Sequence, residues 1–224
     1  ENCFKDEAKV ICPDVKMHFL DGKNQENKHK TLACGDIFMS LSDNFQETFG
    51  LTPLEGMAAG LPVIVSDWNG YKDTVMDNHD GFKIPSYTLM PGNGEQIAFD
   101  HLMGYTNYDE YIGNLSQKVA IDISVCIDKL KVLIENKDLR KKFGENAKKS
   151  VHNKFAWSKV LDQYKELSNE LDDIRVKSSE EKANNYTLPA DRLDPFFTFE
   201  TYPTMTLNES SVLLKANTMT RDSI

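Results

Sequence analysis

The chain has 224 residues, enough for one large domain or for one domain with an appendage. With 40% hydrophobic and 27% charged residues, its composition is that of a soluble globular protein. The formal net charge of −9 excludes a broadly basic surface of the kind that displaces counterions from nucleic acids, so we expect no nucleic-acid partner.

The first predicted elements are extended. Residues 8–20, "AKVICPDVKMHFL", are predicted to be extended structure interrupted by Pro13. Within them "VKMHFL" (15–20) predicts a strand, because apolar and polar residues alternate. A polar turn and a short helix over 29–34 follow.

Two apolar runs, "DIFMSLS" (36–42) and "PVIVS" (62–66), predict buried strands on either side of a short helix over 52–60. The runs are nearly continuous rather than alternating, which is typical of parallel strands covered on both faces. A short helix over 71–78 and a strand over 82–86 come next. This order predicts an α/β fold, a doubly wound parallel sheet with helices on both faces.

The second half of the chain is predicted to be mainly helical. Residues 88–122 have weak periodicity and are interpreted as an insertion or long loop. Helices are predicted over 124–136, 137–155 and 156–175. In the last of these, one side carries the apolar residues Trp157, Val160, Leu161, Tyr164, Leu167 and Leu171.

After residue 175 the composition changes. A linker is followed by the aromatic stretch "PFFTFETYPTMTL" (195–207), which is predicted to be extended. Such a tail has little core of its own, so it either packs on another surface or is disordered. We therefore predict a domain over 1–175 and a linker with a C-terminal extension over 176–224.

The most informative stretch is "ETFGLTPLEGMAAGLPVIVSDW" (47–68). Thr52, Pro53 and Glu55 predict a helix start, with Thr52 as N-cap, Pro53 at the first position and Glu55 at N3, and Gly60 ends the helix. A helix N-terminus at the carboxyl edge of a parallel strand binds anions, and Gly50 allows close approach of a phosphate.

Each acid in this stretch also has a purely structural explanation. Glu55 is explained by a capping box, and Glu47 by a solvated loop. Their combination around a phosphate-binding helix start favours a nucleotide sugar, whose diphosphate needs amides and whose hydroxyls need carboxylates. The following residues 67–70 are explained by a turn, with a ligand contact of Trp68 as the alternative.

Glu-Thr-Phe-Gly-Leu-Thr-Pro-Leu-Glu followed by Gly-Met-Ala-Ala-Gly-Leu-Pro-Val resembles the signature of retaining glycosyltransferases of the group 1 family (glycosyltransferase family 4). In that signature seven residues separate two Glu, as they separate Glu47 and Glu55. The segments "ACGDIFMSLSDN", "DGFKIP" and 135–164 also resemble the family in order, so the similarity runs from about Val15 to Arg175.

The resemblance implies the C-terminal, donor-binding part of a GT-B fold, with a Rossmann-like sheet. It implies that Glu55 holds the ribose and that Glu47 faces the transferred sugar. The amides of Phe49, Gly50, Leu51 and Thr52 would bind the distal phosphate and the sugar. Transfer to a saccharide or glycolipid acceptor would retain the anomeric configuration and need neither a metal nor another cofactor.

Two departures from the family pattern matter. The basic residues that hold the diphosphate have no counterpart before Val10, and an acceptor-binding N-terminal domain is missing. The chain also begins Glu-Asn-Cys rather than Met, so we expect only part of an enzyme. The family implies a cytoplasmic location, and the Lys-rich residues 137–154 leave room for peripheral membrane association.

Other classes remain open at this stage. A glycoside hydrolase would use Glu47 and Glu55 as its paired acids, although it has no need of a phosphate site. A non-catalytic module that binds nucleotide sugars is the second alternative, and a phosphorylase is a weaker third. The four cysteines and five histidines show no metal or redox spacing, and we expect free thiols.

Overall fold

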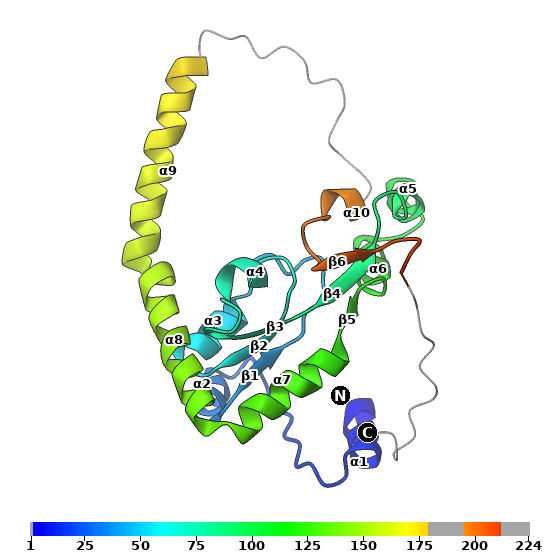
Figure 1. Cartoon of the computed structure of the whole chain (residues 1–224). Helices are drawn as coiled ribbons and strands as arrows, with labels where there is room; N and C mark the ends of the chain where they lie inside the picture. Colours follow the sequence, from blue (N-terminus) through cyan, green and yellow to red (C-terminus); the bar gives the residue numbers. More distant parts are fainter. Residues whose placement is uncertain (1, 179–194, 212–224) are drawn as a thin grey trace. The chain divides into compact units, whose positions relative to one another are not determined.

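The computed structural model describes residues 2–178 and 195–211, and the chain divides into two units (Figure 1). One unit comprises residues 1–31 and 209–224, and the other comprises residues 32–208. Helix α2 (Gln25–Cys34) confirms the short helix predicted over 29–34 and begins earlier.

The strand predicted over 15–20 in the first unit is wrong. Helix α1 (Asn2–Ile11) occupies the start of the stretch predicted to be extended, and residues 15–20 form no regular structure. Val15 and Met17 are exposed there. An alternating pattern becomes a strand only where a neighbouring strand supplies backbone partners, and none of the described strands pairs with this segment.

The second unit is built on a parallel sheet, as predicted. Strands β1 (Phe38–Ser40), β2 (Val63–Ser66) and β3 (Gly81–Ile84) lie in the order β1–β2–β3, and both pairs are parallel. All four residues of the central strand β2 are buried. The apolar run over 62–66 is continuous because both faces of this strand are covered.

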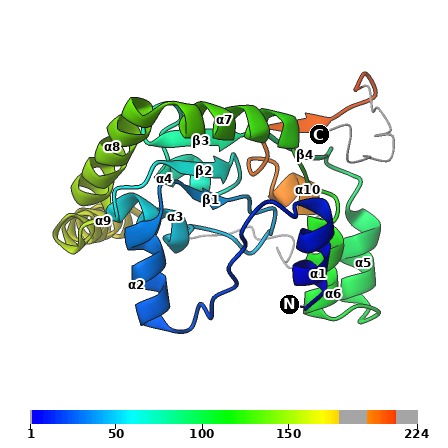
Figure 2. The ribbon, with the colours of Figure 1, turned by 90° about the horizontal axis from the view of Figure 1, so that it is seen from below.

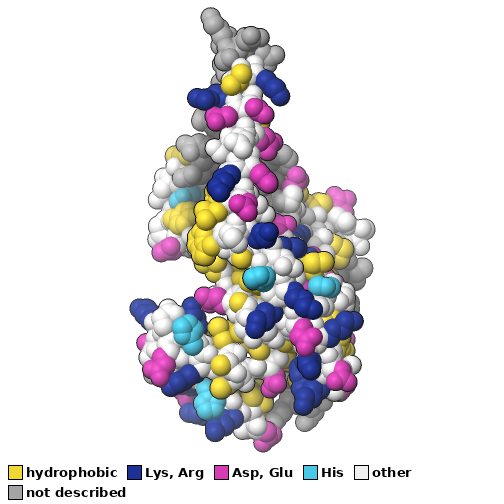
Figure 3. Space-filling view, turned by 90° about the vertical axis from the view of Figure 1, so that its left-hand side faces the viewer, with side chains coloured by type: hydrophobic (Ala, Val, Ile, Leu, Met, Phe, Trp, Pro, Cys, Tyr) yellow, Lys and Arg dark blue, Asp and Glu magenta, His cyan; other side chains and the backbone are white. Residues whose placement is uncertain are grey.

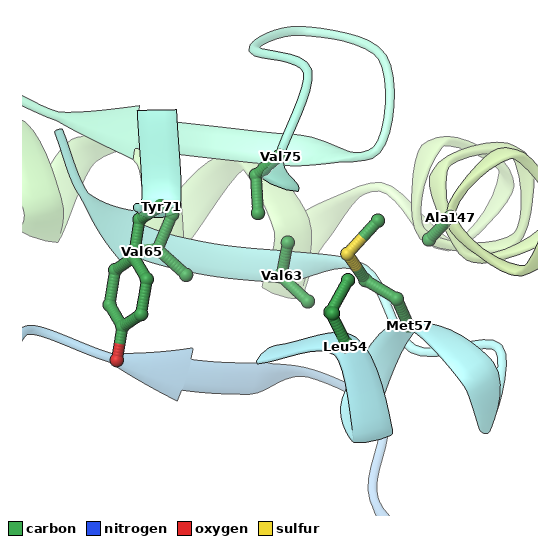
Figure 4. Packing of buried hydrophobic residues seen from close by; sticks show 7 residues of the cluster. All are labelled: Leu54, Met57, Val63, Val65, Tyr71, Val75 and Ala147. Atoms are coloured by element: carbon green, nitrogen blue, oxygen red, sulfur yellow. The ribbon is translucent and has the colours of Figure 1, made fainter. Parts of the chain in front are cut away.

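One face of the sheet is covered by α3 (Leu51–Ala58) and by the short helix α4 (Tyr71–Thr74). Leu54 and Met57 of α3 pack there against Val63 and Val65 of β2, as Figure 4 shows. The small residues of α3 allow this close packing. A side chain at Gly56 would collide with the ring of Phe38.

Helices α7 (Ile123–Glu135) and α8 (Lys137–Phe155) cover the opposite face (Figure 2). Ile64 points to this side and packs with Leu133 of α7 and Phe143 of α8. Successive residues of a strand face opposite sides, so Val63 and Val65 of β2 enter the cluster on one face and Ile64 enters the cluster on the other. The prediction of a sheet with helices on both faces is confirmed.

Residues 88–122 were predicted to be an insertion or a long loop, and the long-loop alternative is wrong. Strand β4 (Ser86–Leu89) is followed by α5 (Glu95–Leu102), α6 (Tyr108–Ser116) and β5 (Ala120–Ile121), which pairs antiparallel with β4. A reciprocal capping box between Asn107 and Glu110 starts α6, and Leu115 is fully buried. Short helices with one or two buried residues show little periodicity, which is why the pattern was missed.

The three helices predicted after residue 123 are confirmed. The last, α9 (Trp157–Ser178), continues over 176–178, where a linker was predicted. Within the predicted extended tail, α10 (Pro195–Thr198) forms first and only β6 (Met205–Leu207) is a strand, paired parallel with β4. Residues 199–204 form turns and bends rather than a strand. Residues 179–194 and 212–224 lie outside the described ranges, and the domain boundary at 175 stays a prediction.

Candidate functional site

Two loops lie at the carboxyl edge of the parallel sheet. Residues 41–50 follow β1, and residues 67–70 follow β2. The Ser66 hydroxyl donates to the Ser42 carbonyl oxygen at 2.5 Å, and Trp68 Nε1 donates to the Asn44 carbonyl oxygen at 3.0 Å. Ligands of open α/β sheets collect at this edge, and here the two loops are tied to each other.

Gly50 sets the direction in which the first loop enters α3. It is the N-cap residue, with φ at 79°, in the left-handed region that favours glycine. A side chain at this position would also overlap the ring of Tyr71, and one at Gly70 would collide with the backbone of residues 48 and 49. Each loop thus needs its glycine. Gly50 is needed for its backbone conformation and for the close approach of Tyr71, and Gly70 is needed for the close approach of residues 48 and 49.

The predicted cap of α3 is wrong in detail. The helix begins at Leu51, so Thr52 is its second residue and Glu55 lies beyond its first turn. Glu55 therefore cannot complete a capping box. Because Gly50 serves as the N-cap, the helix begins at Leu51 and not after Thr52 as predicted. In contrast, side chains cap α6, α7 and α8, whereas Gly50 provides α3 with no side-chain hydrogen bond.

Glu47 and Tyr71 meet beside this helix start. The Tyr71 hydroxyl lies 3.4 Å from Glu47 Oε2 and 2.9 Å from Ser40 Oγ, and it also has a hydrogen bond with the Thr52 side chain. Figure 4 shows the Tyr71 ring beside Val65, with its hydroxyl pointing out of the cluster. The structure therefore places Glu47 and Thr52 of the predicted site around one phenol.

The protonated state of the Tyr71 phenol is favoured at this position. Burial raises the pKa of Tyr71 above its ordinary value of 10.0, and the negative charge of Glu47 acts in the same direction. Hydrogen bonds from Ser40 and Thr52 act against this but do not cancel it. The phenol stays protonated near neutral pH, so it can donate a hydrogen bond to the Glu47 carboxylate.

Trp68 belongs to the core. Its side chain is fully buried, and its ring lies 5.1 Å from that of Phe45 and 5.5 Å from that of Tyr202, both edge-on. The alternative of a ligand contact for Trp68 is therefore wrong. The indole packs inward against aromatic rings from two separate segments of the chain.

Phe49 lies at the border of a groove. Its ring packs edge-on against Phe155 at 5.8 Å, and it is 45% exposed. The groove has a volume of about 400 Å³. It is lined by Phe49, Phe155, Val160, Gln163, Tyr164 and Leu167. Figure 3 shows hydrophobic side chains gathered along one flank of α9, so the apolar stripe predicted for this helix is only partly covered.

Residues 2–178 and 195–211 contain neither a metal-binding cluster nor a helix that could span a membrane. No three His, Cys, Asp or Glu side chains lie close enough to hold a metal ion. No helix there is long and apolar enough to cross a membrane. Cys12, Cys34 and Cys126 are free thiols.

Sequence reasoning missed three residues that shape the site. Ser40 ends β1, Tyr71 starts α4, and Asn69 donates a hydrogen bond from Nδ2 to the Glu47 carbonyl oxygen at 2.6 Å. Only one signal could have identified Tyr71 and Asn69: both follow a predicted parallel strand, at the edge where ligands bind. Ser40 lies within the strand predicted over 36–42, and nothing else in the sequence indicates a role for it in the site.

A parallel sheet with polar loops and a helix start without a side-chain cap at its carboxyl edge defines a ligand-binding α/β domain. Residues 1–90 match the family profile described as Glycosyl transferases group 1. Alpha-1,3/1,6-mannosyltransferase ALG2 of Dictyostelium discoideum is 40% identical over 80 residues, which are 35% of this chain and 18% of that protein.

Two other relatives match longer stretches. Sulfoquinovosyl transferase SQD2 of Arabidopsis thaliana is 21% identical over 154 residues, 69% of this chain and 24% of that protein. N-acetyl-alpha-D-glucosaminyl L-malate synthase of Bacillus anthracis is 25% identical over 143 residues, 64% of this chain and 28% of that protein. The chain thus spans between 18% and 28% of the length of these relatives.

These matches agree with the resemblance: over residues 1–90 the chain is similar to the group 1 glycosyltransferases, and the relatives it matches are named as transferases and a synthase. The GT-B arrangement and the retaining stereochemistry stay predictions. So do the individual roles of Glu47, Phe49, Gly50, Leu51, Thr52 and Glu55.

Proposed function

We propose that the chain is the donor-binding part of a retaining glycosyltransferase, which moves a glycosyl unit from a nucleotide sugar to a saccharide or glycolipid acceptor. The observation that carries this proposal is the start of α3. It has no side-chain cap, it lies at the carboxyl edge of a parallel sheet, and a carboxylate held by a protonated phenol stands beside it.

The parts of this site match the parts of the donor. The amides of Phe49, Gly50, Leu51 and Thr52 would bind the distal phosphate, with the helix dipole supplying partial positive charge. This charge would take the place of a metal ion, so we expect metal-independent transfer. A helix N-terminus acts most strongly on charge that develops close to it, such as that on a departing diphosphate.

The two acids would bind hydroxyl groups. Glu47 would accept a hydrogen bond from the transferred sugar while Tyr71 holds its carboxylate. Glu55 lies one turn into α3, is half-buried, and would accept hydrogen bonds from the ribose. Glu55 does not complete a capping box, because Gly50 and not Thr52 is the N-cap of α3.

The relatives bear on the substrate class. Their names describe mannosyl, sulfoquinovosyl and N-acetylglucosaminyl transfer or synthesis, so we propose a hexose-derived glycosyl unit. A separate domain would supply the acceptor site. The exposed lysines of α8, Lys141, Lys142, Lys148, Lys149 and Lys154, support peripheral association with the cytoplasmic face of an anionic membrane.

Saturation-transfer NMR with UDP-, GDP-, ADP- and TDP-glucose tests the proposal. We expect one nucleotide to show ribose and base contacts with the wild-type chain. Glu55→Ala should weaken that binding about tenfold or more, since it removes a charge-assisted hydrogen bond. Glu47→Ala should leave the nucleotide contacts in place, because its carboxylate would face the sugar, and should lower transfer in the complete enzyme.

Thermal unfolding of each variant is the control for folding. The proposal is contradicted if no nucleotide sugar contacts either this chain or a longer protein that includes an acceptor domain. Release of free sugar from a glycoside without a nucleotide would favour a hydrolase instead. Binding without transfer by the complete enzyme would indicate a non-catalytic module.

A further inference from the structure

Residues 195–207 pack onto the two loops of the candidate site. Phe196 of α10 is fully buried and lies in one cluster with Phe45 and Trp68. The ring of Tyr202 stacks on Phe45 with centroids 6.1 Å apart. Phe45 lies two residues before Glu47, so this segment contacts the first loop directly. Burial of these aromatic side chains stabilises the contact.

Polar contacts fix the same segment to the second loop. Lys72 Nζ donates to the carbonyl oxygens of Thr201 at 2.9 Å and of Pro203 at 2.6 Å. The Thr204 hydroxyl donates to Asp67 Oδ2 at 2.6 Å, and the Thr204 N–H donates to the Ser86 carbonyl oxygen at 3.0 Å. The segment is therefore held at several adjacent points and not by its aromatic rings alone.

Asn69 joins this segment to the candidate site. Its backbone N–H donates to the Tyr202 carbonyl oxygen at 3.2 Å, while its Nδ2 donates to the Glu47 carbonyl oxygen at 2.6 Å. With φ at 37°, Asn69 has a backbone conformation that asparagine and glycine adopt most readily. One residue thus bonds the C-terminal segment on one side and the loop of Glu47 on the other.

We infer that residues 195–207 hold the 41–50 loop in its binding geometry through Asn69, which makes Asn69 a positioning residue for Glu47. This inference rests on the proposed function for its consequence, which is donor binding. The physical link itself is independent of any ligand. The loop depends on a segment far away in the chain, so an alteration of that segment changes the site without touching it.

Asn69→Gly tests the link. Glycine keeps the backbone conformation accessible and removes the side-chain hydrogen bonds of Asn69 to the Glu47 carbonyl oxygen and to the Tyr202 side chain. Asn78→Gly is the matched control. Asn78 also has a positive φ, of 57°, and its Nδ2 bonds the neighbouring Asp77, in a turn at the opposite edge of the sheet. Both variants replace an asparagine of positive φ by glycine and remove a side-chain hydrogen bond, but only Asn69 lies beside the candidate site.

The first readout is amide hydrogen exchange over residues 44–50. We expect about fivefold faster exchange in Asn69→Gly, as for the loss of one neutral hydrogen bond, and no change in Asn78→Gly. Lys72→Met removes the two hydrogen bonds from Lys72 Nζ to residues 201 and 203, and it should speed exchange over the same residues. Unchanged exchange in Asn69→Gly and in Lys72→Met would overturn the inference.

The second readout is affinity for the nucleotide sugar that the wild-type chain binds. Weaker binding by Asn69→Gly, by about fivefold, together with unchanged binding by Asn78→Gly, supports the positioning role. Faster exchange with unchanged affinity would overturn it. If the exchange result holds but the wild type binds none of the four nucleotide sugars, the proposed function fails and the link between segment and loop stands.

Discussion

The two edges of the same parallel sheet use a carboxylate in opposite ways. At the amino edge, Asp80 is fully buried, and three groups contact its carboxylate: the Met76 N–H at 3.1 Å, the Ser150 hydroxyl at 2.9 Å and His79 Nδ1 at 2.7 Å. At the carboxyl edge, the half-buried Glu47 carboxylate has, among the described residues, one hydrogen-bond partner, Tyr71, at 3.4 Å.

This difference separates stability from function. A carboxylate whose oxygens are satisfied inside the fold joins elements together, and here Asp80 links the start of β3 to α8. A carboxylate with a long bond and open acceptor positions retains the capacity to bind a ligand. We therefore expect changes at the amino edge to lower stability and changes at the carboxyl edge to act mainly on binding.

The largest expected effect is at Asp80. Asp80→Ala should lower the free energy of unfolding by about 3 kcal/mol or more, because it leaves the buried Ser150 hydroxyl and the Met76 N–H without their acceptor. Urea unfolding measures this loss. Asp128→Ala, at an exposed position of α7, is the control and should cost less than about 0.5 kcal/mol. Equal stability of the two variants would contradict the comparison.

Glycines at the two edges give a smaller effect. Gly50 and Gly60 both have positive φ, 79° and 84°, but a side chain at Gly60 would meet nothing within 4 Å, whereas one at Gly50 would overlap Tyr71. Gly60→Ala should cost about 1–2 kcal/mol for its conformation alone. Gly50→Ala should cost about 1–3 kcal/mol more, because Tyr71 must move.

Urea unfolding of both glycine variants measures that difference, and nucleotide-sugar binding by the folded protein adds a second comparison. Gly50→Ala should weaken binding because it displaces the Tyr71 hydroxyl from Glu47. Gly60→Ala should bind as the wild type does. Equal losses of stability in the two variants would show that the Tyr71 ring moves freely, contrary to the packing at this edge.

The smallest effect concerns pH. The pKa of Tyr71 is raised in the folded chain, chiefly by burial, above its ordinary value of 10.0. The folded state therefore keeps a proton that the unfolded state loses first. This stabilisation is complete below the unfolded pKa and is lost as the pH rises through the folded pKa. Tyr71→Phe should show less loss of stability than the wild type between about pH 9 and about pH 11.

Two other groups titrate in that range and make the paired variant necessary. Burial also raises the pKa of Tyr202, which adds a loss of the same sign, and burial lowers the pKa of Lys72, which acts in the opposite direction. Both remain in Tyr71→Phe, so the difference between the two proteins isolates Tyr71. Parallel pH profiles in urea unfolding would contradict a buried, protonated phenol at the site.

Much of the sheet layer could be predicted from the chain. The runs over 36–42 and 62–66 became β1 and β2 because apolar residues on both faces of a strand leave few other solutions. The helix between them was predicted in place, and its start was wrong by two residues because Gly50 took the N-cap position. Residues 88–122 were missed because their helices bury too few side chains to show a period.

The sequence by itself determined the parallel layer, the position of the Glu47–Glu55 stretch at its carboxyl edge and the similarity to the group 1 glycosyltransferases. These features depend on local order along the chain and on the period of burial. Only the tertiary structure decided which groups surround Glu47. Ser40, the neighbours Asn69 and Tyr71, and Tyr202 come from three separate segments, and their hydrogen bonds exist only in the folded chain.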